Sequence, residues 1–194
     1  MSQTVVMEDK AFKNIEFGKL GIWIFLIIDG LSFAAVLMAA SYLRRNGAPW
    51  PAPGETLNVP LTAFNTFVLL FSSYTMMIAL EAVKAGEHKK FIRFLVMTLL
   101  LGLTFLGIQA FEYTHLITEH FIPSVSVYAG CFFGATGFHG LHVLSGVIFI
   151  LYVLIAGLKG RFTAENHLRV ETLTLFWHFV DLMWVLVFTV VYLL

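Results

Sequence analysis

Long apolar runs, separated by short polar stretches, are the dominant pattern of this sequence. About 20 helical residues cross the hydrocarbon core of a bilayer, and five of the runs reach that length. A strand edge would leave backbone groups unpaired in lipid, and the runs lack the alternation of a barrel, so we expect helices throughout. The sequence therefore predicts an all-α, polytopic transmembrane helix bundle of five spans, at Leu20–Leu43, Leu61–Val83, Phe91–Phe111, Val125–Leu158 and Thr172–Leu194.

The composition agrees with a membrane protein and excludes several other classes. Apolar residues make up 59% of the 194 residues and charged residues only 12%, whereas soluble domains average about 25% charged residues. The 12 basic and 12 acidic side chains cancel, so charge gives no reason to expect a nucleic acid partner. Cys131 is the only cysteine, which excludes an internal disulfide framework and a metal site built from several cysteines of this chain.

The basic residues indicate the orientation of the chain. Ten of the twelve lie near the N-terminus or in the turns after the second and fourth spans, and only Arg44 and Arg45 lie on the other side. Short loops rich in Lys and Arg stay in the cytoplasm, so we expect the N-terminus inside and the C-terminus outside. In a mitochondrion, "inside" would be the matrix. We find no repeat and no removable signal peptide, and we treat residues 1–194 as a single transmembrane domain.

Ionisable residues inside the spans are the first candidates for function, because they are costly in a membrane. Asp29 lies in the first span, where it is either a carboxyl that accepts protons or orders lipid, or a neutral group that fixes helix packing. His178 and Asp181 lie three residues apart in the fifth span and form either a proton relay or, as we favour, a structural hydrogen bond. Glu112 ends the third span as an interfacial carboxylate, unless it pairs with a histidine of the fourth span.

Two histidines lie in the fourth span, within the glycine-rich stretch Gly134–Gly146. His139 and His142 are three residues apart, so they share one face of a helix. Imidazole is a common ligand of metals and haem, but only these two and His178 lie clearly within spans, too few for a catalytic haem-copper centre. We expect a phospholipid headgroup or a structural hydrogen bond at these residues, and no metal.

The glycines of the fourth span predict a close contact between helices. Gly130, Gly134 and Gly137 form a seam of small residues, and such seams let helix backbones approach in membranes. The sequence contains none of the common nucleotide-binding or hydrolase motifs.

Three motifs, taken together and in this order, resemble one family. They are Phe105–Tyr113 (Phe-Leu-Gly-Ile-Gln-Ala-Phe-Glu-Tyr), Thr136–Val143 (Thr-Gly-Phe-His-Gly-Leu-His-Val) and Trp177–Trp184 (Trp-His-Phe-Val-Asp-Leu-Met-Trp). Looser similarity at Trp50-Pro51, at Asn65–Leu70 and before His167 extends the resemblance over the chain from Leu20 onward. The sequence resembles subunit III of the haem-copper cytochrome c oxidases, in the short five-helix form found in bacteria.

The resemblance implies a subunit without a catalytic centre. Such a subunit carries no cofactor of its own, since haem and copper are held by partner subunits, and it packs beside the catalytic subunit I in a complex with subunit II. It holds phospholipids in a cleft between its first two helices and the remaining bundle, supports proton uptake, and protects subunit I from inactivation during turnover. The complex, in a bacterial plasma membrane, reduces oxygen with electrons from cytochrome c or quinol and pumps protons. A larger respiratory supercomplex is a further partner that the resemblance allows.

The resemblance, which marks Glu112, His139 and Lys159, and the residue patterns described above together give the expected roles. We expect no catalytic residue and no metal ligand. The residues expected to bind lipid or to take part in proton uptake are Asp29, Glu112, His139 and Lys159. The residues expected to form structural polar pairs are His142, His178 and Asp181. The family usually has a glutamate in the first span, where this sequence has Asp29. The aspartate side chain is shorter, so a lipid contact or reaction that depends on the longer glutamate is not expected to carry over unchanged.

Two other functions are alternatives. The first is an accessory subunit of a nitric oxide reductase, a relative within the same superfamily. The second, from a different class, is a self-sufficient membrane cytochrome or proton carrier that uses His139, His142, His178 and Asp181. Haem retained by the isolated chain would favour the second.

Overall fold

The computed structural model describes residues 17–47, 49–51 and 54–194. Within these residues the chain forms five long helices and a short π-helical end, without strands. The elements are α2 (Phe17–Arg45), α3 (Val59–Lys84), α4 (His88–Thr118), α5 (Val127–Leu158), α6 (Leu168–Phe188) and η1 (Thr189–Leu193). Lys10 and Lys13, which contribute to the predicted orientation, lie outside the described residues.

Each of these five helices is long and apolar enough to cross a membrane, which confirms the predicted all-α bundle of five spans. α5 begins at Val127, two residues later than predicted. α2, α3 and α4 extend beyond the predicted spans, most clearly α4, which continues to Thr118 although we placed the end of this span at Phe111. The reason is that Glu112 does not mark the edge of the bundle, because it is buried against neighbouring elements. The side of the membrane on which each terminus lies stays a prediction.

Local sequence sets several of the helix ends. The Asn58 side chain accepts a hydrogen bond of 3.1 Å from a backbone amide in the first turn of α3, and Ser126 accepts one of 3.0 Å in α5. Each therefore caps its helix. Pro60 lies in the first turn of α3, where its missing N–H is not needed. Gly86 and Gly160, with φ values of 75° and 68°, reverse the chain after α3 and α5.

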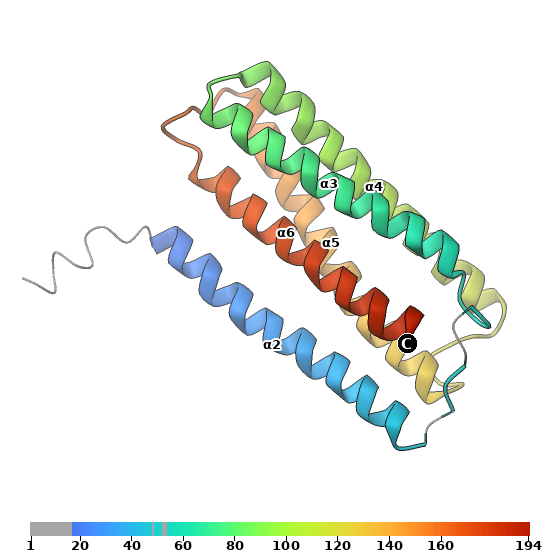
Figure 1. The fold of residues 1–194 in the computed structure, drawn as a ribbon. Coiled ribbons are helices and arrows are strands. Elements are labelled where there is room, and N and C mark those ends of the chain that lie inside the picture. The colour runs from blue at the N-terminus through green and yellow to red at the C-terminus, as the bar shows by residue number, and fades with distance from the viewer. Residues whose placement is uncertain (1–16, 48, 52–53) are drawn as a thin grey trace, which may run out of the picture.

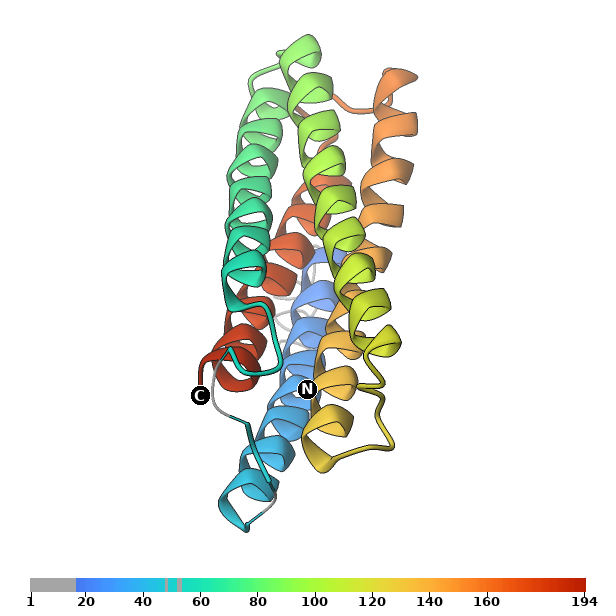
Figure 2. The same ribbon diagram turned by 90° about the vertical axis from the view of Figure 1, so that its right-hand side faces the viewer.

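The helices divide into two unequal parts (Figures 1 and 2). α3 and α4 lie side by side as the most extensive helix pair, and α6 packs against both α3 and α5. α2 lies on the opposite side of α6 from α3, and its substantial contacts are with α5 and α6. We expected the first two helices to stand apart from the rest as a unit, but α3 belongs with α4 and only α2 stands apart.

The core of the larger part is built around Trp177 of α6, which is fully buried. A Cβ atom placed on Gly102 of α4 would lie 2.9 Å from the indole ring, and one on Gly146 of α5 would lie 2.7 Å from it. Only glycine leaves room for the ring at these two positions. The indole Nε1 donates a hydrogen bond of 2.9 Å to Ser72 Oγ on α3, so a single side chain joins four helices.

The predicted glycine seam is not the place of close helix contact within this chain. A Cβ atom on Gly134 would meet no atom within 4 Å, and one on Gly137 would meet only the Tyr113 hydroxyl, at 3.6 Å. Gly130 comes no closer than 3.5 Å, to a backbone carbonyl. Within this chain the close contact is at Gly146 instead, because spacing along one helix does not reveal which glycine faces a large side chain. Whether the seam contacts a lipid or another subunit stays a prediction.

α2 joins the bundle through a narrow stripe. Its buried apolar residues recur every three to four or seven positions, as expected for one face of a helix, and they are Leu26, Phe33, Leu37 and Ala40. Asp29 lies in the same stripe and is 9% exposed. Most of the remaining surface of α2 is exposed and apolar, including Trp23, Ile27 and Leu31, as suits a helix that faces lipid.

Candidate functional site

Asp29 on α2 and His142 on α5 form a polar contact between these two helices. Nε2 of His142 lies 3.1 Å from both carboxylate oxygens of Asp29. Phe33, one turn further along α2, packs against the imidazole with a ring-centre distance of 5.1 Å. The side chains of the pair are only 15% and 11% exposed. Both residues were candidates from the sequence, but the contact between them was not predicted.

The contacts of His142 restrict where its protons lie. Nδ1 is 2.7 Å from the carbonyl oxygen of Phe138, and because a carbonyl only accepts, Nδ1 donates this hydrogen bond. A hydrogen bond between Nε2 and Asp29 then needs exactly one more proton, held by the carboxyl group or by the imidazole. The pair is neutral in either case. Neutrality lowers the cost of placing a carboxyl group inside a membrane span.

Glu112 joins three elements at the other end of the bundle from the turn at Gly86. Its Oε1 accepts a hydrogen bond of 3.1 Å from Thr62 on α3, and its Oε2 accepts one of 2.9 Å from the Tyr192 hydroxyl on η1. The residue is 7% exposed. We predicted an interfacial carboxylate, with a histidine of the fourth span as an alternative partner. The structure shows instead a buried carboxylate whose partners are hydroxyl groups.

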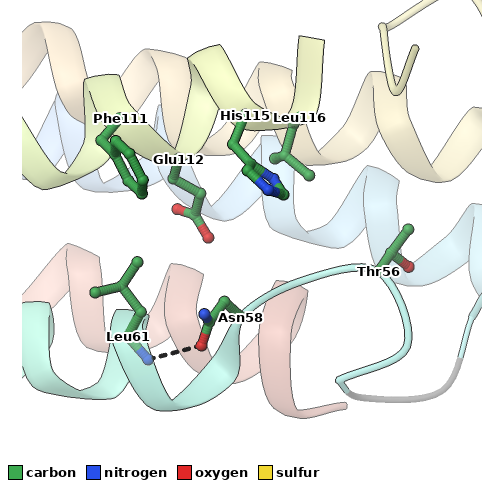
Figure 3. A pocket seen from close by; sticks show the side chains of 7 residues that line it. All are labelled: Thr56, Asn58, Leu61, Phe111, Glu112, His115 and Leu116. Atoms are coloured by element: carbon green, nitrogen blue, oxygen red, sulfur yellow. Dashed lines mark hydrogen bonds between the residues drawn. The ribbon is translucent and has the colours of Figure 1, made fainter. Parts of the chain in front are cut away.

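A cavity of about 310 Å³ adjoins Glu112 between the start of α3 and the end of α4 (Figure 3). Its lining combines apolar and polar side chains, namely Thr56, Asn58, Leu61, Phe111, Glu112, His115 and Leu116. No lysine or arginine belongs to this lining. The two hydroxyl hydrogen bonds are therefore the main compensation for burying this carboxyl group.

His139 is enclosed by aromatic rings. It is 0% exposed, and the Trp184 and Phe105 rings lie 4.8 Å and 5.8 Å from its own. Neither ring nitrogen has a hydrogen-bond partner among the described residues. A lipid headgroup would reach His139 only if these rings moved, so its expected lipid contact stays a prediction that the packing does not favour.

His178 and Asp181 do not form the hydrogen-bonded pair that we predicted. Nδ1 of His178 is hydrogen-bonded to Ser73 Oγ on α3. Asp181 is 4% exposed, and neither of its oxygens has a hydrogen-bond partner within the described part of the chain. His178 thus makes a contact between helices, as the structural interpretation expects, but with a serine that the sequence did not single out.

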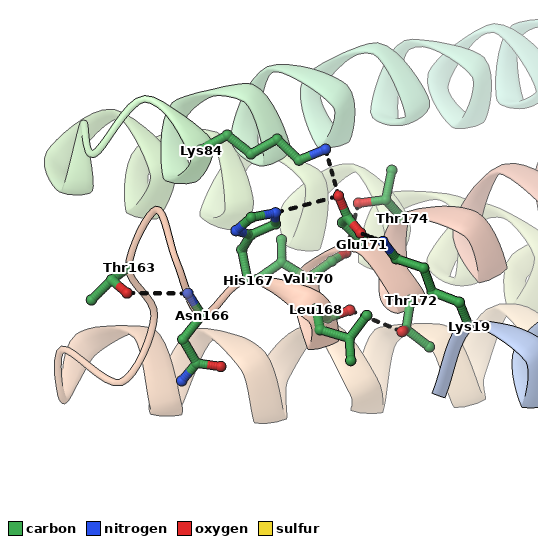
Figure 4. A network of polar contacts seen from close by, with 10 residues as sticks. All are labelled: Lys19, Lys84, Thr163, Asn166, His167, Leu168, Val170, Glu171, Thr172 and Thr174. Carbon is green, nitrogen blue, oxygen red and sulfur yellow. Dashed lines mark hydrogen bonds and ion pairs between the residues drawn. The ribbon is translucent and has the colours of Figure 1, made fainter. Parts of the chain in front are cut away.

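We did not predict a role for Glu171, which lies at the start of α6 between three basic side chains (Figure 4). Its carboxylate is 2.5 Å from Lys84 Nζ on α3 and 2.9 Å from Lys19 Nζ on α2. His167 Nε2 lies 3.4 Å away. An acidic residue four positions after a histidine at a basic helix start is the signal that could have found it. Lys159, which we did predict, is exposed at the end of α5.

The predicted residues therefore fall into separate contacts between helices rather than one pocket. Among the residues that the structure describes, no group of three or more His, Cys, Asp or Glu side chains is placed to hold a metal ion. The contacts can hold protons and can fix helices against each other.

The fold and these contacts define a multi-pass α-helical membrane protein whose polar groups join its helices. Comparison with known families finds a match over residues 5–194 to the family described as cytochrome c oxidase subunit III. The chain belongs to the cytochrome c oxidase subunit III family. Members of this family are subunits of haem-copper oxidase complexes, so the chain works as part of a complex with other subunits.

Individual relatives agree with the family match. The chain is 39% identical over 175 residues to cytochrome bo(3) ubiquinol oxidase subunit 3 of Pseudomonas aeruginosa, covering 90% of this chain and 83% of the relative. It is 33% identical over 192 residues to cytochrome c oxidase subunit 3 of Thermostichus vulcanus, covering 98% and 94%. It is also 33% identical over 180 residues to a probable quinol oxidase subunit 3 of Staphylococcus aureus, covering 92% and 90%.

Proposed function

We propose that this chain is the non-catalytic subunit III of a proton-pumping haem-copper terminal oxidase in a bacterial plasma membrane. Its partners in this proposal are the catalytic subunit I and subunit II, which hold the haem and copper. The chain itself binds phospholipid, supports proton uptake and stabilises the catalytic subunit. Membership of the subunit III family supports the accessory role. The contact between Asp29 and His142 is the main structural observation that supports a role for residues of this chain.

The Asp29–His142 pair suits both a structural and a proton-related role. It joins α2 to α5 within the buried stripe of α2, and it holds one proton inside a membrane span. Polar contacts of this kind contribute on average about 0.6 kcal/mol and up to about 1.7 kcal/mol in membrane proteins. A contact of that size can fix the position of one helix without dominating the stability of the bundle.

Lipid binding is supported by an apolar groove between α2 and α6. The groove has a volume of about 330 Å³, and its lining is almost wholly apolar: Trp23, Leu26, Ile27, Leu175, His178, Phe179 and Leu182. It follows the helices and can take one acyl chain. We expect the exposed Lys159, at the end of α5, to meet phospholipid headgroups at the membrane surface.

Affinity purification through this chain, in a mild detergent, tests the assignment as a whole. We expect a large histidine-rich subunit to copurify, together with the reduced-minus-oxidised spectrum of an a-type or o-type haem. Copurification with a subunit that contains haem b and non-haem iron and reduces nitric oxide would contradict the proposal. Haem retained by this chain alone would contradict it as well.

Two substitutions of Asp29 separate its structural role from its proton-related role. Asp29→Ala removes the contact, and we expect the purified complex to keep its cofactor spectrum, to lose bound phospholipid and to inactivate sooner during turnover. Asp29→Asn retains a donor toward Nε2 of His142 but cannot exchange a proton with it. Active lifetime, bound lipid and the rate of proton uptake are measured for both variants in the intact complex.

The pattern across the two variants decides between the roles. Recovery of lifetime and lipid in Asp29→Asn shows that the contact acts by holding α2, whereas slow proton uptake that persists in this variant shows that the shared proton matters. Ser32→Ala is the matched control, because Ser32 is exposed on the same helix and its hydroxyl only bonds a carbonyl one turn earlier. If Asp29→Ala behaves like this control, the role of Asp29 proposed here is wrong.

A further inference from the structure

Arg44 and Arg45 are adjacent basic residues at the end of α2, far from the other cations of the described chain. Both are exposed, and they lie at the end of the bundle that also contains η1, opposite the Lys84 end. Arginine is scarce on the outer side of membrane proteins, the side on which we expect this end to lie. Two neighbouring arginines at this end therefore call for an anionic partner.

Within the described residues, neither arginine has an acidic partner. The ion pairs of this part of the chain involve other cations. Instead, the two arginines line a cavity of about 330 Å³ between the end of α2 and the C-terminal end of the chain. Its other lining residues are Ser41, Trp50, Val190 and Leu194. No acidic side chain belongs to this lining, and the two guanidinium groups are its only charged side chains.

The position of Arg44 is fixed by aromatic packing. Its guanidinium carbon lies 5.8 Å from the centre of the Trp50 ring, a distance at which a cation is attracted to the ring face. Trp50 in turn packs edge-to-face on Tyr128, with a ring-centre distance of 4.7 Å. The Tyr128 hydroxyl donates a hydrogen bond of 3.3 Å to the Val191 carbonyl oxygen. These contacts connect Arg44 to η1 through Trp50 and Tyr128. Packing between these residues therefore defines the shape of the cavity.

We propose that this cavity, the Arg44/Arg45 site, binds the phosphate group of an anionic phospholipid such as phosphatidylglycerol. A guanidinium group presents paired N–H donors that match phosphate oxygens, and here two such groups adjoin one cavity. Met38 and Tyr42, one to two turns earlier on α2, are 66% and 67% exposed and offer an apolar surface along which acyl chains can lie. The site extends the lipid binding proposed above to residues that the family resemblance does not mark, and it rests on that proposed function.

The test is lipid retention by the purified oxidase complex in nanodiscs made of phosphatidylcholine and phosphatidylglycerol, measured by native mass spectrometry. We expect the native complex to retain phosphatidylglycerol in preference to phosphatidylcholine, and the R44Q/R45Q variant to bind it about 30-fold more weakly. R44K/R45K keeps the charge and should retain most of the preference. K89Q/K90Q makes the same change of charge at the other end of the bundle and should leave this binding unchanged.

The outcomes separate this site from lipid binding in general. Unchanged preference for phosphatidylglycerol in R44Q/R45Q overturns the site, while retention of neither lipid by the native complex overturns the proposed lipid binding itself. Displacement of the bound lipid by millimolar inorganic phosphate would assign the site to free phosphate and overturn its lipid identity. If R44Q/R45Q does not assemble, the native complex decides, because the absence of a preference for phosphatidylglycerol over phosphatidylcholine also overturns the site.

Discussion

The part of the bundle formed by α3 to α6 and the single helix α2 are held in different ways. In the most apolar stretch of the span formed by α6 and η1, 56% of the residues are buried, against 11% in that of α2. α6 carries the fully buried Trp177 and Trp184 into contact with three neighbouring helices. α2 contributes one narrow stripe, a contact at Asp29 and an ion pair at Lys19.

This difference shows what holds helices together in a membrane. Lipid tails are as apolar as leucine, so the exposed apolar surface of α2 gives no net drive toward the bundle. Close packing of shapes and polar contacts must supply the association instead. The larger part relies mainly on shape, through large rings beside glycines, whereas α2 relies more on a few polar groups.

Substitution of Gly146 should destabilise the larger part selectively, and it gives the largest effect that we predict. Gly146→Ala would place a Cβ atom 2.7 Å from the Trp177 ring and 3.4 Å from Phe176, so the ring has to move. Forcing extra atoms into a packed core costs about 1–3 kcal/mol. We expect a lower yield of intact complex and a lower unfolding temperature, and Gly146→Leu should prevent assembly.

Gly134→Ala is the matched control for Gly146→Ala, because its Cβ atom would meet nothing within 4 Å in the same helix. Alanine also favours a helix over glycine by about 1 kcal/mol, so we expect equal or slightly higher stability. If Gly134→Ala proves the more damaging of the two, the glycine face of α5 packs against a partner subunit and the internal packing described here is not what limits assembly.

Loss of the Glu112 contact should have the next largest effect, and it probes a polar contact within the larger part. Glu112→Ala leaves the Tyr192 hydroxyl, 2% exposed as a residue, without its acceptor. Thr62 keeps a second acceptor, the Asn58 carbonyl oxygen at 3.1 Å. An unpaired buried hydroxyl costs about 1–3 kcal/mol. We expect a lower unfolding temperature and easier proteolysis of the chain's C-terminal end.

Glu112→Gln sharpens this prediction, since the amide oxygen can still accept from Tyr192 and should recover most of the stability. Glu119→Ala is the control for charge alone, because the Glu119 side chain is 60% exposed one to two turns further along. Equal stability of Glu112→Ala and Glu119→Ala would mean that the buried hydrogen bonds contribute nothing measurable.

The spans and the family could be predicted from the sequence, because both depend on features that are local along the chain. Hydropathy needs no knowledge of tertiary contacts, and the three motifs are continuous stretches. Asp29, His142 and Glu112 were also found, since any ionisable residue within a span stands out against apolar neighbours. Their partners were not found. Asp29 and His142 are 113 positions apart, and only the relative rotation of two helices decides that they meet.

The glycines illustrate the same limit. Gly134 and Gly146 lie in one helix and look alike in the sequence, yet only the second faces Trp177. Glu171 was not predicted, for another reason. It lies at the edge of its span, where charged residues are common, and its partners Lys19 and Lys84 lie on two other helices.

Neutralising Glu171 should give the smallest effect, and it should be seen most clearly in α2. The two lysine side chains are 41% and 43% exposed, and the Glu171 side chain is 15% exposed. Ion pairs with solvent-exposed partners contribute about 0–1 kcal/mol, so Glu171→Gln should lower the unfolding temperature only slightly. Local opening of α2 near Lys19 should nevertheless increase, seen as faster amide hydrogen exchange in its first turns. High salt should produce the same change in the native complex and no further change in the variant, because it screens the same charges.

Glu87→Gln is the control, because it removes a carboxylate that pairs with Lys90 at the start of α4 and should not alter exchange in α2. Exchange in α2 that responds to neither Glu171→Gln nor salt would mean that the apolar stripe and Asp29 hold this helix without the ion pairs.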